Sequence, residues 1–315
     1  MEGLKMLYVL IQVGNIKYNP IDKKELKSNI IANRLKEILL LFSKNNTESF
    51  WIDKAEMLIS EVIKFIRLYN NDYVTFDEIH KIINDNTYYI CKKKVIKKKL
   101  LKNEYTEEEV FNINTSVDYI EKEFLKLDER TKGIIVAEIS RITGLFVLNY
   151  DINKTFCPKE NEINFQGFKE VIEQGKIVVL KMNTSKYGDI SRIIASYLKM
   201  DFQREVLIQA IKEDKNKIRK TAFISDEYQE YVTKNDSRET MCINVIATQS
   251  YSSLYNALND EFSTDVIIQS LVNKIWYRQD DIRTIEKAQK LIGKEEKQKV
   301  SKTMSESSKE TNYNY

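Results

Sequence analysis

The chain has 315 residues, of which 42% are hydrophobic, so it can bury a large core and is long enough for two domains. Its formal net charge is only +3 although 31% of its residues are charged, so an argument for nucleic-acid binding has to rest on local clusters of charge. Its 3 cysteines lie far apart and it has 1 histidine, which excludes a disulfide framework and a zinc site. No apolar run approaches the roughly 20 residues that cross a bilayer.

The first half of the chain changes from a mixed pattern to a purely helical one. Residues 1–46 contain an apolar run of strand length followed by one helix. Residues 47–150 have helical periodicity and almost no strand signal, and the Thr-x-x-Glu pattern of a capping box occurs at Thr75 and Thr106. We therefore expect an all-α domain of residues 47–150, inserted into a fold that begins in residues 1–46.

Residues 151–293 alternate between strand and helix, and residues 294–315 form a polar tail. Gly175 ends one helix in the manner of a capping glycine, and an uninterrupted apolar run follows it. Fully apolar strands that alternate with helices are typical of an α/β fold, with a mainly parallel sheet and helices on both faces. The expected strands are residues 8–13, 176–182, 221–225, 243–248 and 273–278. The expected helices in this half are residues 165–174, 190–212, 227–235, 251–259, 263–272 and 281–292.

Two adjacent acids, Asp226 and Glu227, follow the apolar run 221–225. A buried strand of a nucleotide hydrolase presents a magnesium-associated carboxylate and a water-activating carboxylate in this way. The next apolar run ends in Gln249 and Ser250, where a neighbouring strand would carry an amide that senses phosphate. The alternative interpretation is that these are solvated polar residues at strand ends.

A lysine-rich segment lies within the expected all-α domain. On a helix, Ile96 and Leu100 could face the core while the lysines point outward to contact phosphate or an acidic partner. The segment has no interleaved aromatic residues, so we expect non-specific, salt-sensitive DNA binding if it binds DNA at all. An ordinary solvated helix face is the alternative. The lysines are Lys92, Lys93, Lys94, Lys97, Lys98, Lys99 and Lys102.

Several short motifs occur in order along nearly the whole chain. They are Asn19-Pro20, Phe50-Trp51 with Ala55, the run from Gly175 to Leu180, Asp226-Glu227, the run from Ser237 to Glu239, the run from Ala247 to Ser250, and Gly293. Taken together, these motifs resemble the conjugative coupling ATPases of type IV secretion systems, the TraG/TraD-type members of the FtsK and HerA superfamily. The resemblance implies a RecA-like core with an inserted all-α domain.

Membership of this family would imply a homo-hexameric motor that uses ATP and magnesium. Its partners would be a relaxase–DNA complex and the ATPases of the secretion channel, at the cytoplasmic, inner face of the cell membrane. Asp226 would hold the magnesium and its water shell, Glu227 would polarise the attacking water, and Gln249 with Ser250 would contact the terminal phosphate. Arg238 and Arg278 are candidates for an arginine that reaches a neighbouring subunit's nucleotide, with ordinary salt bridges as the alternative.

The sequence departs from the family pattern in two places. It contains no Gly-x-x-x-x-Gly-Lys-Ser/Thr loop to bind phosphate, and the stretch from Glu227 to Arg238 is shorter than the family pattern. We therefore interpret the chain as a carboxyl-terminal fragment that binds neither ATP nor magnesium alone, whose family reaches the membrane through a missing amino-terminal segment. Whether the chain is an enzyme stays open. The second hypothesis is a non-catalytic module that docks DNA or protein.

Overall fold

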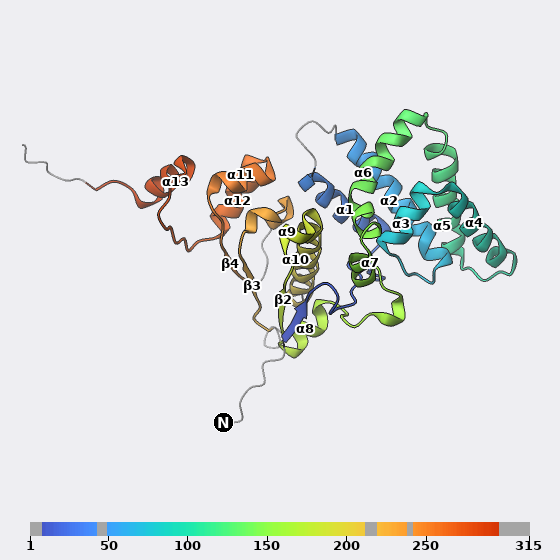
Figure 1. Cartoon of the computed structure of the whole chain (residues 1–315), viewed down its shortest axis with the longest axis horizontal. Helices are drawn as coiled ribbons and strands as arrows, with labels where there is room; N and C mark the ends of the chain where they lie inside the picture. The colour runs from blue at the N-terminus through green and yellow to red at the C-terminus, as the bar shows by residue number, and fades with distance from the viewer. Residues whose placement is uncertain (1–7, 43–48, 212–218, 238–241, 296–315) are drawn as a thin grey trace, which may run out of the picture.

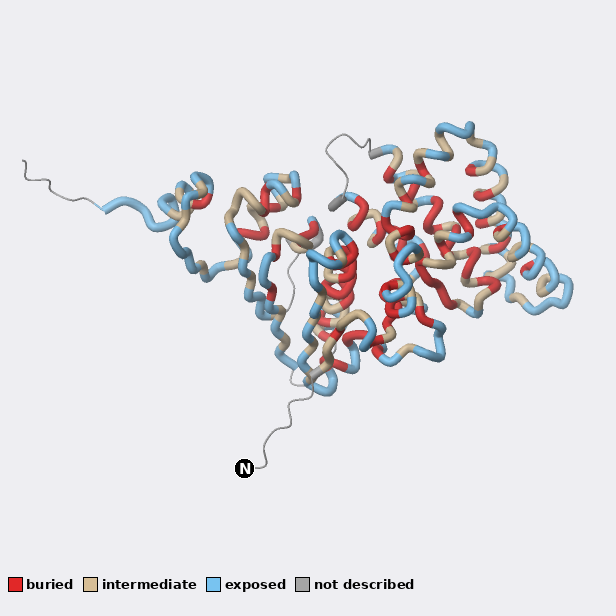
Figure 2. Tube along the Cα trace, viewed as in Figure 1, coloured by how far each residue is buried: buried red, intermediate tan, exposed pale blue. Residues whose placement is uncertain are grey.

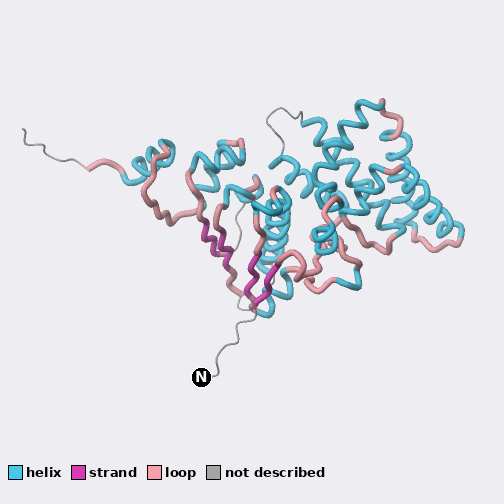
Figure 3. The backbone as a smooth tube through the Cα atoms, viewed as in Figure 1, coloured by secondary structure: helices cyan, strands magenta, loops and turns pink. Residues whose placement is uncertain are grey.

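The structure is a computed structural model that describes residues 8–42, 49–211, 219–237 and 242–295. A large block of helices occupies one side of the molecule, and a layer of short strands adjoins it (Figure 1). The last helices extend beyond the strand layer, away from the helical block (Figure 3). Among the described residues, no helix is long and apolar enough to cross a membrane.

The helical block follows the apolar periodicity and capping signals of the sequence. Thr75 accepts a hydrogen bond from the Glu78 backbone N–H at 3.1 Å, and Thr106 and Glu109 form a complete capping box. The block contains α1 (Ser28–Phe42), α2 (Ser49–Tyr69), α3 (Phe76–Asn84), α4 (Asn86–Leu101), α5 (Glu107–Asp118), the π-helix η1 (Tyr119–Phe124), α6 (Glu129–Val147) and α7 (Tyr150–Phe156).

The remaining helices lie among and beyond the strands. Gly175 adopts a left-handed conformation with φ of 67° at the end of α8, as the capping signal predicted. These helices are α8 (Phe168–Gln174), α9 (Thr184–Tyr187), α10 (Asp189–Ala210), α11 (Tyr251–Leu258), α12 (Glu261–Ser270) and α13 (Ile282–Ile292). Short 3₁₀ turns are η2 (Glu160–Glu162), η4 (Tyr228–Glu230) and η5 (Lys234–Ser237).

Four strands form two separate parallel pairs in the described part of the chain. β1 (Tyr8–Ile11) pairs with β2 (Ile177–Leu180), and β3 (Ala222–Ser225) pairs with β4 (Ile243–Ile246). The first four predicted strands therefore exist in shortened form. A single mainly parallel sheet with helices on both faces is not confirmed, because no ladder joins the two pairs among the described residues.

Two local predictions are wrong. Residues 273–278 are not a strand, since none of the described strands pairs with them and Tyr277 is 87% exposed. The helix expected over residues 227–235 is replaced by η4, an irregular stretch at residues 231–233 and the start of η5. Glu227 has a left-handed backbone with φ of 49°, which is incompatible with continuing a right-handed helix.

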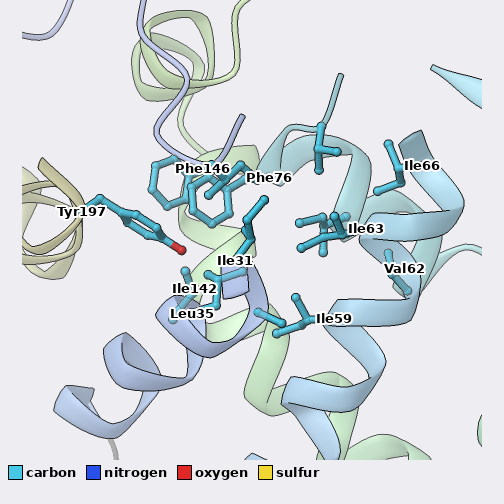
Figure 4. Close-up of a cluster of buried hydrophobic side chains, with 14 of the residues drawn as sticks. Ile31, Leu35, Ile59, Val62, Ile63, Ile66, Phe76, Ile142, Phe146 and Tyr197 are labelled. Carbon is cyan, nitrogen blue, oxygen red and sulfur yellow. The ribbon is translucent and has the colours of Figure 1, made fainter. Parts of the chain in front are cut away.

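The main hydrophobic core joins helices that lie far apart in sequence. Phe76 of α3 and Phe146 of α6 stack with ring centroids 4.0 Å apart, and Tyr197 of α10 meets Phe76 edge to face (Figure 4). Ile31 of α1 and Ile63 of α2 complete this cluster. The red segments of Figure 2 gather between these helices and thin out toward the strands and α13. The division into domains stays a prediction.

Candidate functional site

The parallel pairing of β3 and β4 places the predicted polar residues at one edge. Ser225 and Ile246 are partners at the carboxyl ends of the two strands. Asp226 follows Ser225 directly, and Gln249 lies 3 residues after Ile246, both at the surface. Parallel strands end at the same edge of a sheet, so the chain itself brings these side chains together.

Glu227 is turned toward Gln249 by its local backbone. Its N–H donates to Asp226 Oδ1 at 2.9 Å, while the next residue, Tyr228, donates its N–H to the Ala247 carbonyl at 3.0 Å. The left-handed conformation of Glu227 is uncommon for a side chain of this type and is found mostly where surrounding contacts hold it. The turn after β3 is therefore fastened to the end of β4.

Neutral amides surround the Glu227 carboxylate. Gln249 Nε2 donates to Glu227 Oε2 at 3.0 Å, and Gln229 Nε2 donates to the same oxygen. The Thr248 hydroxyl donates to Gln229 Oε1 at 2.7 Å, which orients that amide. Among the described residues no cation pairs with Glu227, and its exposed carboxylate is oriented by the two amides.

The other predicted residues of this edge have different surroundings. Ser250 caps α11, accepting a hydrogen bond from the Ser253 N–H at 3.0 Å. Arg278 is exposed, and within the described chain no hydrogen bond or ion pair joins it to the two acids. Its neighbour Gln279 does reach the edge, donating to the Gln249 carbonyl at 2.9 Å. Arg238 lies outside the described residues.

A buried ion pair, absent from our sequence analysis, anchors the segment that follows the acids. Lys199 of α10 pairs with Asp236, and both side chains are at most 2% exposed. Lys199 Nζ also donates to the Tyr231 carbonyl at 2.6 Å, and the Tyr228 hydroxyl donates to Asp236 Oδ2 at 2.6 Å. The available signal was a lysine within the otherwise apolar stretch of α10 around Tyr197.

The electrostatics of this pair follow from burial and proximity. Burial lowers the pKa of Lys199 below its ordinary value, while the neighbouring Asp236 opposes that change. For Asp236 burial acts to raise the pKa, but Lys199 and the hydrogen bonds from Tyr228 and Thr233 hold it below its usual range. Each partner thus opposes the effect of burial on the other, which favours the ionised form of both groups. Burial also raises the pKa of Tyr231, whose hydroxyl donates to the Asp226 carbonyl at 3.0 Å.

The residues at this edge fit part of a nucleotide site only. Asp226 supplies a carboxylate suited to magnesium, and Glu227 with Gln249 supplies an acid and an amide. In the described residues, no group of three histidine, cysteine or acidic side chains is arranged to hold a metal. The sequence contains no glycine-rich phosphate loop, so a nucleotide's phosphates have no backbone cradle here.

The lysines of the lysine-rich helix α4 fall into two groups. Some contact an aromatic ring or a carboxylate, and the others are exposed to solvent. Lys92 Nζ lies over the rings of Tyr69 and Tyr88 at 4.9 and 4.8 Å, and Lys93 pairs with Glu121. Ile96 is buried, as its helical position predicted. The expectation that Lys93 lies in solvent is wrong, since its side chain is 20% exposed and pairs with Glu121 of η1.

The other lysines of this helix are more accessible. Lys99 is half-buried, and Lys102 lies 3.7 Å from a carboxylate oxygen of Glu104. The exposed members without an ion pair in the described chain are Lys94, Lys97 and Lys98.

Comparison with known proteins leaves the family undetermined. No protein-family model matches the chain, and no curated protein matches it. Among solved structures the chain is similar to one titled "Bacterial conjugative coupling protein TrwBdeltaN70. Unbound monoclinic form", with 14% sequence identity and a TM-score of 0.49. The alignment covers 81% of this chain and 56% of that chain, so this chain spans little more than half the length of the similar protein.

Proposed function

We propose that the chain is part of a conjugative DNA-transfer coupling ATPase that recruits a relaxase–DNA substrate to a type IV secretion channel, and that it is inactive in isolation. The observation that supports this proposal is the pairing of Glu227 with Gln249 at the carboxyl edge of β3 and β4, 3.0 Å apart and beside Asp226. An acid and an amide at adjacent parallel strand ends suit hydrolysis of a nucleoside triphosphate.

Each residue has a specific role in this proposal. In the intact protein, ATP and magnesium supply the reacting phosphate and the charge that neutralises it. Asp226 orients the magnesium's water shell, Glu227 accepts a proton from the attacking water, and the Gln249 amide contacts the terminal phosphate. Lys199 and Asp236 position the segment after Glu227 from below the surface.

The remaining features of the proposal concern assembly. The intact protein is a homo-hexamer that works with the relaxase–DNA complex and the channel ATPases at the inner face of the cell membrane. An arginine from a neighbouring subunit, Arg238 or Arg278, completes the charge around the phosphate.

The test begins with the isolated chain. Because it has no phosphate cradle, we expect weak or absent ATP binding in a fluorescent-nucleotide titration and phosphate release at the background rate. Micromolar affinity, or turnover that Glu227→Gln abolishes, would show that the isolated chain is itself an ATPase with an unconventional phosphate site.

The second arm of the test supplies a phosphate-binding loop, which the isolated chain lacks. The DNA upstream of this chain is first inspected for a phosphate-loop motif; if it encodes one, that polypeptide is added as a separate chain, and phosphate release is measured with magnesium and ATP. We expect turnover that falls by about 10²-fold or more in Glu227→Gln. Glu230→Gln is the matched control, because Glu230 lies 3 residues away and pairs with Arg192 rather than facing Gln249. Equal effects of the two substitutions would overturn the role of Glu227.

A second candidate function is a non-catalytic docking module for DNA or protein. The observation in its favour is the cluster of exposed lysines on α4, which faces away from the core and suits the phosphate backbone of DNA. DNA binding that is unchanged by Glu227→Gln, together with no ATP hydrolysis under either condition above, would favour this candidate.

A further inference from the structure

A cavity of about 170 Å³ lies in the helical block, between α2, the π-helix η1 and the first turns of α6. Its wall is mainly apolar. Phe50 comes from α2, Phe124 from η1, Leu127 from the turn that follows, and Ile135 from α6. An engineered apolar cavity of about 150 Å³ holds a benzene molecule. The cavity in the helical block is therefore large enough for one aromatic ring.

The cavity has a fixed floor and an accessible mouth. Phe124 is 7% exposed and Ile135 is 2% exposed, and both belong to the main hydrophobic core. α2 contacts both η1 and α6, and these elements lie together in the helical block of Figure 1. Phe50, in contrast, is 52% exposed, so it lies on the open side of the cavity. A ligand could therefore enter beside Phe50 without unfolding the block.

The π-helix η1 shapes one wall of the cavity. It continues α5 and closes with a hydrogen bond from the Leu125 N–H to the Ile120 carbonyl at 2.8 Å, five residues back. Turns of this width are rare and occur frequently at functional sites. In such a widened turn, residues four or five positions apart share a face. This places Tyr119, Glu123 and Phe124 on the same wall.

Two opposite charges line the cavity without an ion pair in the described chain. They are the Lys54 ammonium of α2 and the Glu123 carboxylate of η1. Other acids on these two elements are paired, since Glu61 of α2 and Glu121 of η1 each contact a lysine. Lys54 Nζ has a long contact only, 5.9 Å from the centroid of the Phe50 ring. The apolar cavity is thus lined by one cation and one anion that have no charged partner among the described side chains.

We propose that this cavity binds a free aromatic α-amino acid of the size of phenylalanine. The ring lies among the apolar side chains, the α-carboxylate meets the Lys54 ammonium, and the α-ammonium meets the Glu123 carboxylate. A zwitterionic head group neutralises both charges at once, whereas either end of a peptide carries only one of them. Burial raises the pKa of Tyr119 to about 12, so its hydroxyl stays protonated at neutral pH and adds a neutral donor to the wall. This site does not depend on nucleotide hydrolysis.

Trp51 provides a fluorescent reporter beside the cavity. The chain has 2 tryptophans, so Trp276→Phe leaves Trp51 as the only one. Trp51 packs edge to face on Phe50 with ring centroids 5.0 Å apart, and its emission should change when a ring enters beside Phe50. We expect a saturable change with L-phenylalanine and a Kd of about 1 mM, the range for a ligand of this size. L-Alanine, which lacks the ring, should give no change.

The head group is tested by changing the ligand and the protein together. L-Phenylalanine amide lacks the carboxylate, and N-acetyl-L-phenylalanine lacks the ammonium. Lys54→Gln should weaken L-phenylalanine binding about fivefold and leave binding of the amide unchanged, the size expected for an accessible ion pair. Glu123→Gln should weaken L-phenylalanine binding similarly and leave binding of the N-acetyl compound unchanged. Lys122→Gln is the matched control, because Lys122 is also on η1 but pairs with Asp118 and does not line the cavity.

Thermal melting of the unsubstituted chain gives a measurement that does not depend on tryptophan. L-Phenylalanine well above its Kd should raise the melting temperature, because a ligand that binds only the folded state stabilises it, and L-alanine should not. Melting of each variant without ligand checks that it folds.

Three outcomes would overturn the proposal. The first is a titration with L-phenylalanine that gives neither a saturable fluorescence change nor a shift in melting temperature. The second is an equal loss of binding in Lys54→Gln and Lys122→Gln. The third is binding of N-acetyl-L-phenylalanine amide, which carries neither charge, as tightly as L-phenylalanine. That result would assign the cavity to an aromatic side chain of another polypeptide.

Discussion

The helical block and the strand layer contain the same types of apolar side chain but bury them to different degrees. Ile59 and Ile63 of α2 are at most 1% exposed because helices on several sides meet over them. Ile224 and Ile243 in the strands are 78% and 60% exposed because only one face of their layer is covered. Hydrophobicity alone therefore does not determine burial in this chain. The difference shows that helices enclose the side chains of α2 from several sides, whereas one face of the β3–β4 pair stays uncovered in the described residues.

The largest expected effect comes from comparing truncations in the two regions. Phe76→Ala should lower the free energy of unfolding by about 3–5 kcal/mol, because it empties a fully buried, stacked site. Ile224→Ala should lower it by less than about 1 kcal/mol, because its side chain already contacts water. Urea denaturation of both variants measures the two values. Similar losses would show that the strand face is covered in the isolated chain.

The buried ion pair tests how firmly the strand layer is joined to α10. Lys199→Met should lower the free energy of unfolding by about 3 kcal/mol, because it leaves the Asp236 carboxylate buried without its cation. The control is Lys199→Met/Asp236→Leu, which removes both charges and should recover most of the loss.

Lowering the pH should remove the stabilising contribution of the same ion pair, Lys199 with Asp236. Because the pKa of Asp236 is lower in the folded chain than in the unfolded one, its stabilising contribution is present above about pH 4 and is lost as the pH falls further. Asp236→Asn should weaken the dependence of urea denaturation on pH in that range. An unchanged pH dependence would contradict this assignment.

A smaller effect, in which stability falls rather than rises with increasing pH, is expected at Asp22, shortly before α1. Burial raises the pKa of Asp22 to about 6, despite a hydrogen bond from the Val74 N–H at 3.4 Å. The folded state then binds more protons than the unfolded state between about pH 4 and 6, so the contribution of Asp22 to stability falls as the pH rises through this window. Thermal melting from pH 4 to 7 should show this fall, and Asp22→Asn should remove it.

Asp128, whose pKa is lowered rather than raised, is the control for the measurement on Asp22. Hydrogen bonds from Thr131 lower the pKa of Asp128 at the start of α6, so its contribution is lost only as the pH falls. Asp128→Asn should leave the change between pH 4 and 6 intact. A variant of Asp128 that removed that change would contradict the role given to Asp22.

The smallest effect concerns the surface charge of the helical block. If α4 contacts DNA, reversing Lys94, Lys97 and Lys98 to Glu should weaken binding and reduce the salt slope by about 0.9 for each lysine that neutralises a phosphate of duplex DNA. Fluorescence anisotropy at several salt concentrations measures both quantities. The fold should persist, because these three side chains lie in solvent.

A matched charge reversal in α8 and beside β2 and β3 provides the control for this test. Lys169, Lys181 and Lys220 are also exposed, and changing them to Glu alters the net charge by the same amount. We expect a smaller loss of DNA binding from this second triple variant. Equal losses would mean that net charge, rather than α4, governs the interaction.

Local signals were sufficient for most elements and for one part of the candidate site. The capping box at Thr106 and the capping glycine at Gly175 depend on contacts within one turn, so short sequence patterns predicted both. The acids of β3 and the amide after β4 could be placed at one edge because parallel strands share their carboxyl ends. The catalytic roles of these residues stay predictions.

The errors have a common cause in contacts between distant segments. Residues 273–278 have the composition of a strand, but a strand exists only where another strand supplies its hydrogen bonds. The helix expected after Asp226 is replaced by a turn whose end is held by Lys199, a residue 37 positions before Asp236. No short pattern contains both members of such a pair.

The sequence by itself determined where most helices start and stop, which strands are apolar, and which side chains follow β3 and β4, since capping and periodicity act over a few residues. Only the tertiary structure decided that the strands form two pairs, that Glu227 meets Gln249 and that Lys199 pairs with Asp236. These outcomes depend on which distant surfaces meet. That choice is governed by burial and hydrogen-bond pairing across the whole fold rather than by local preference.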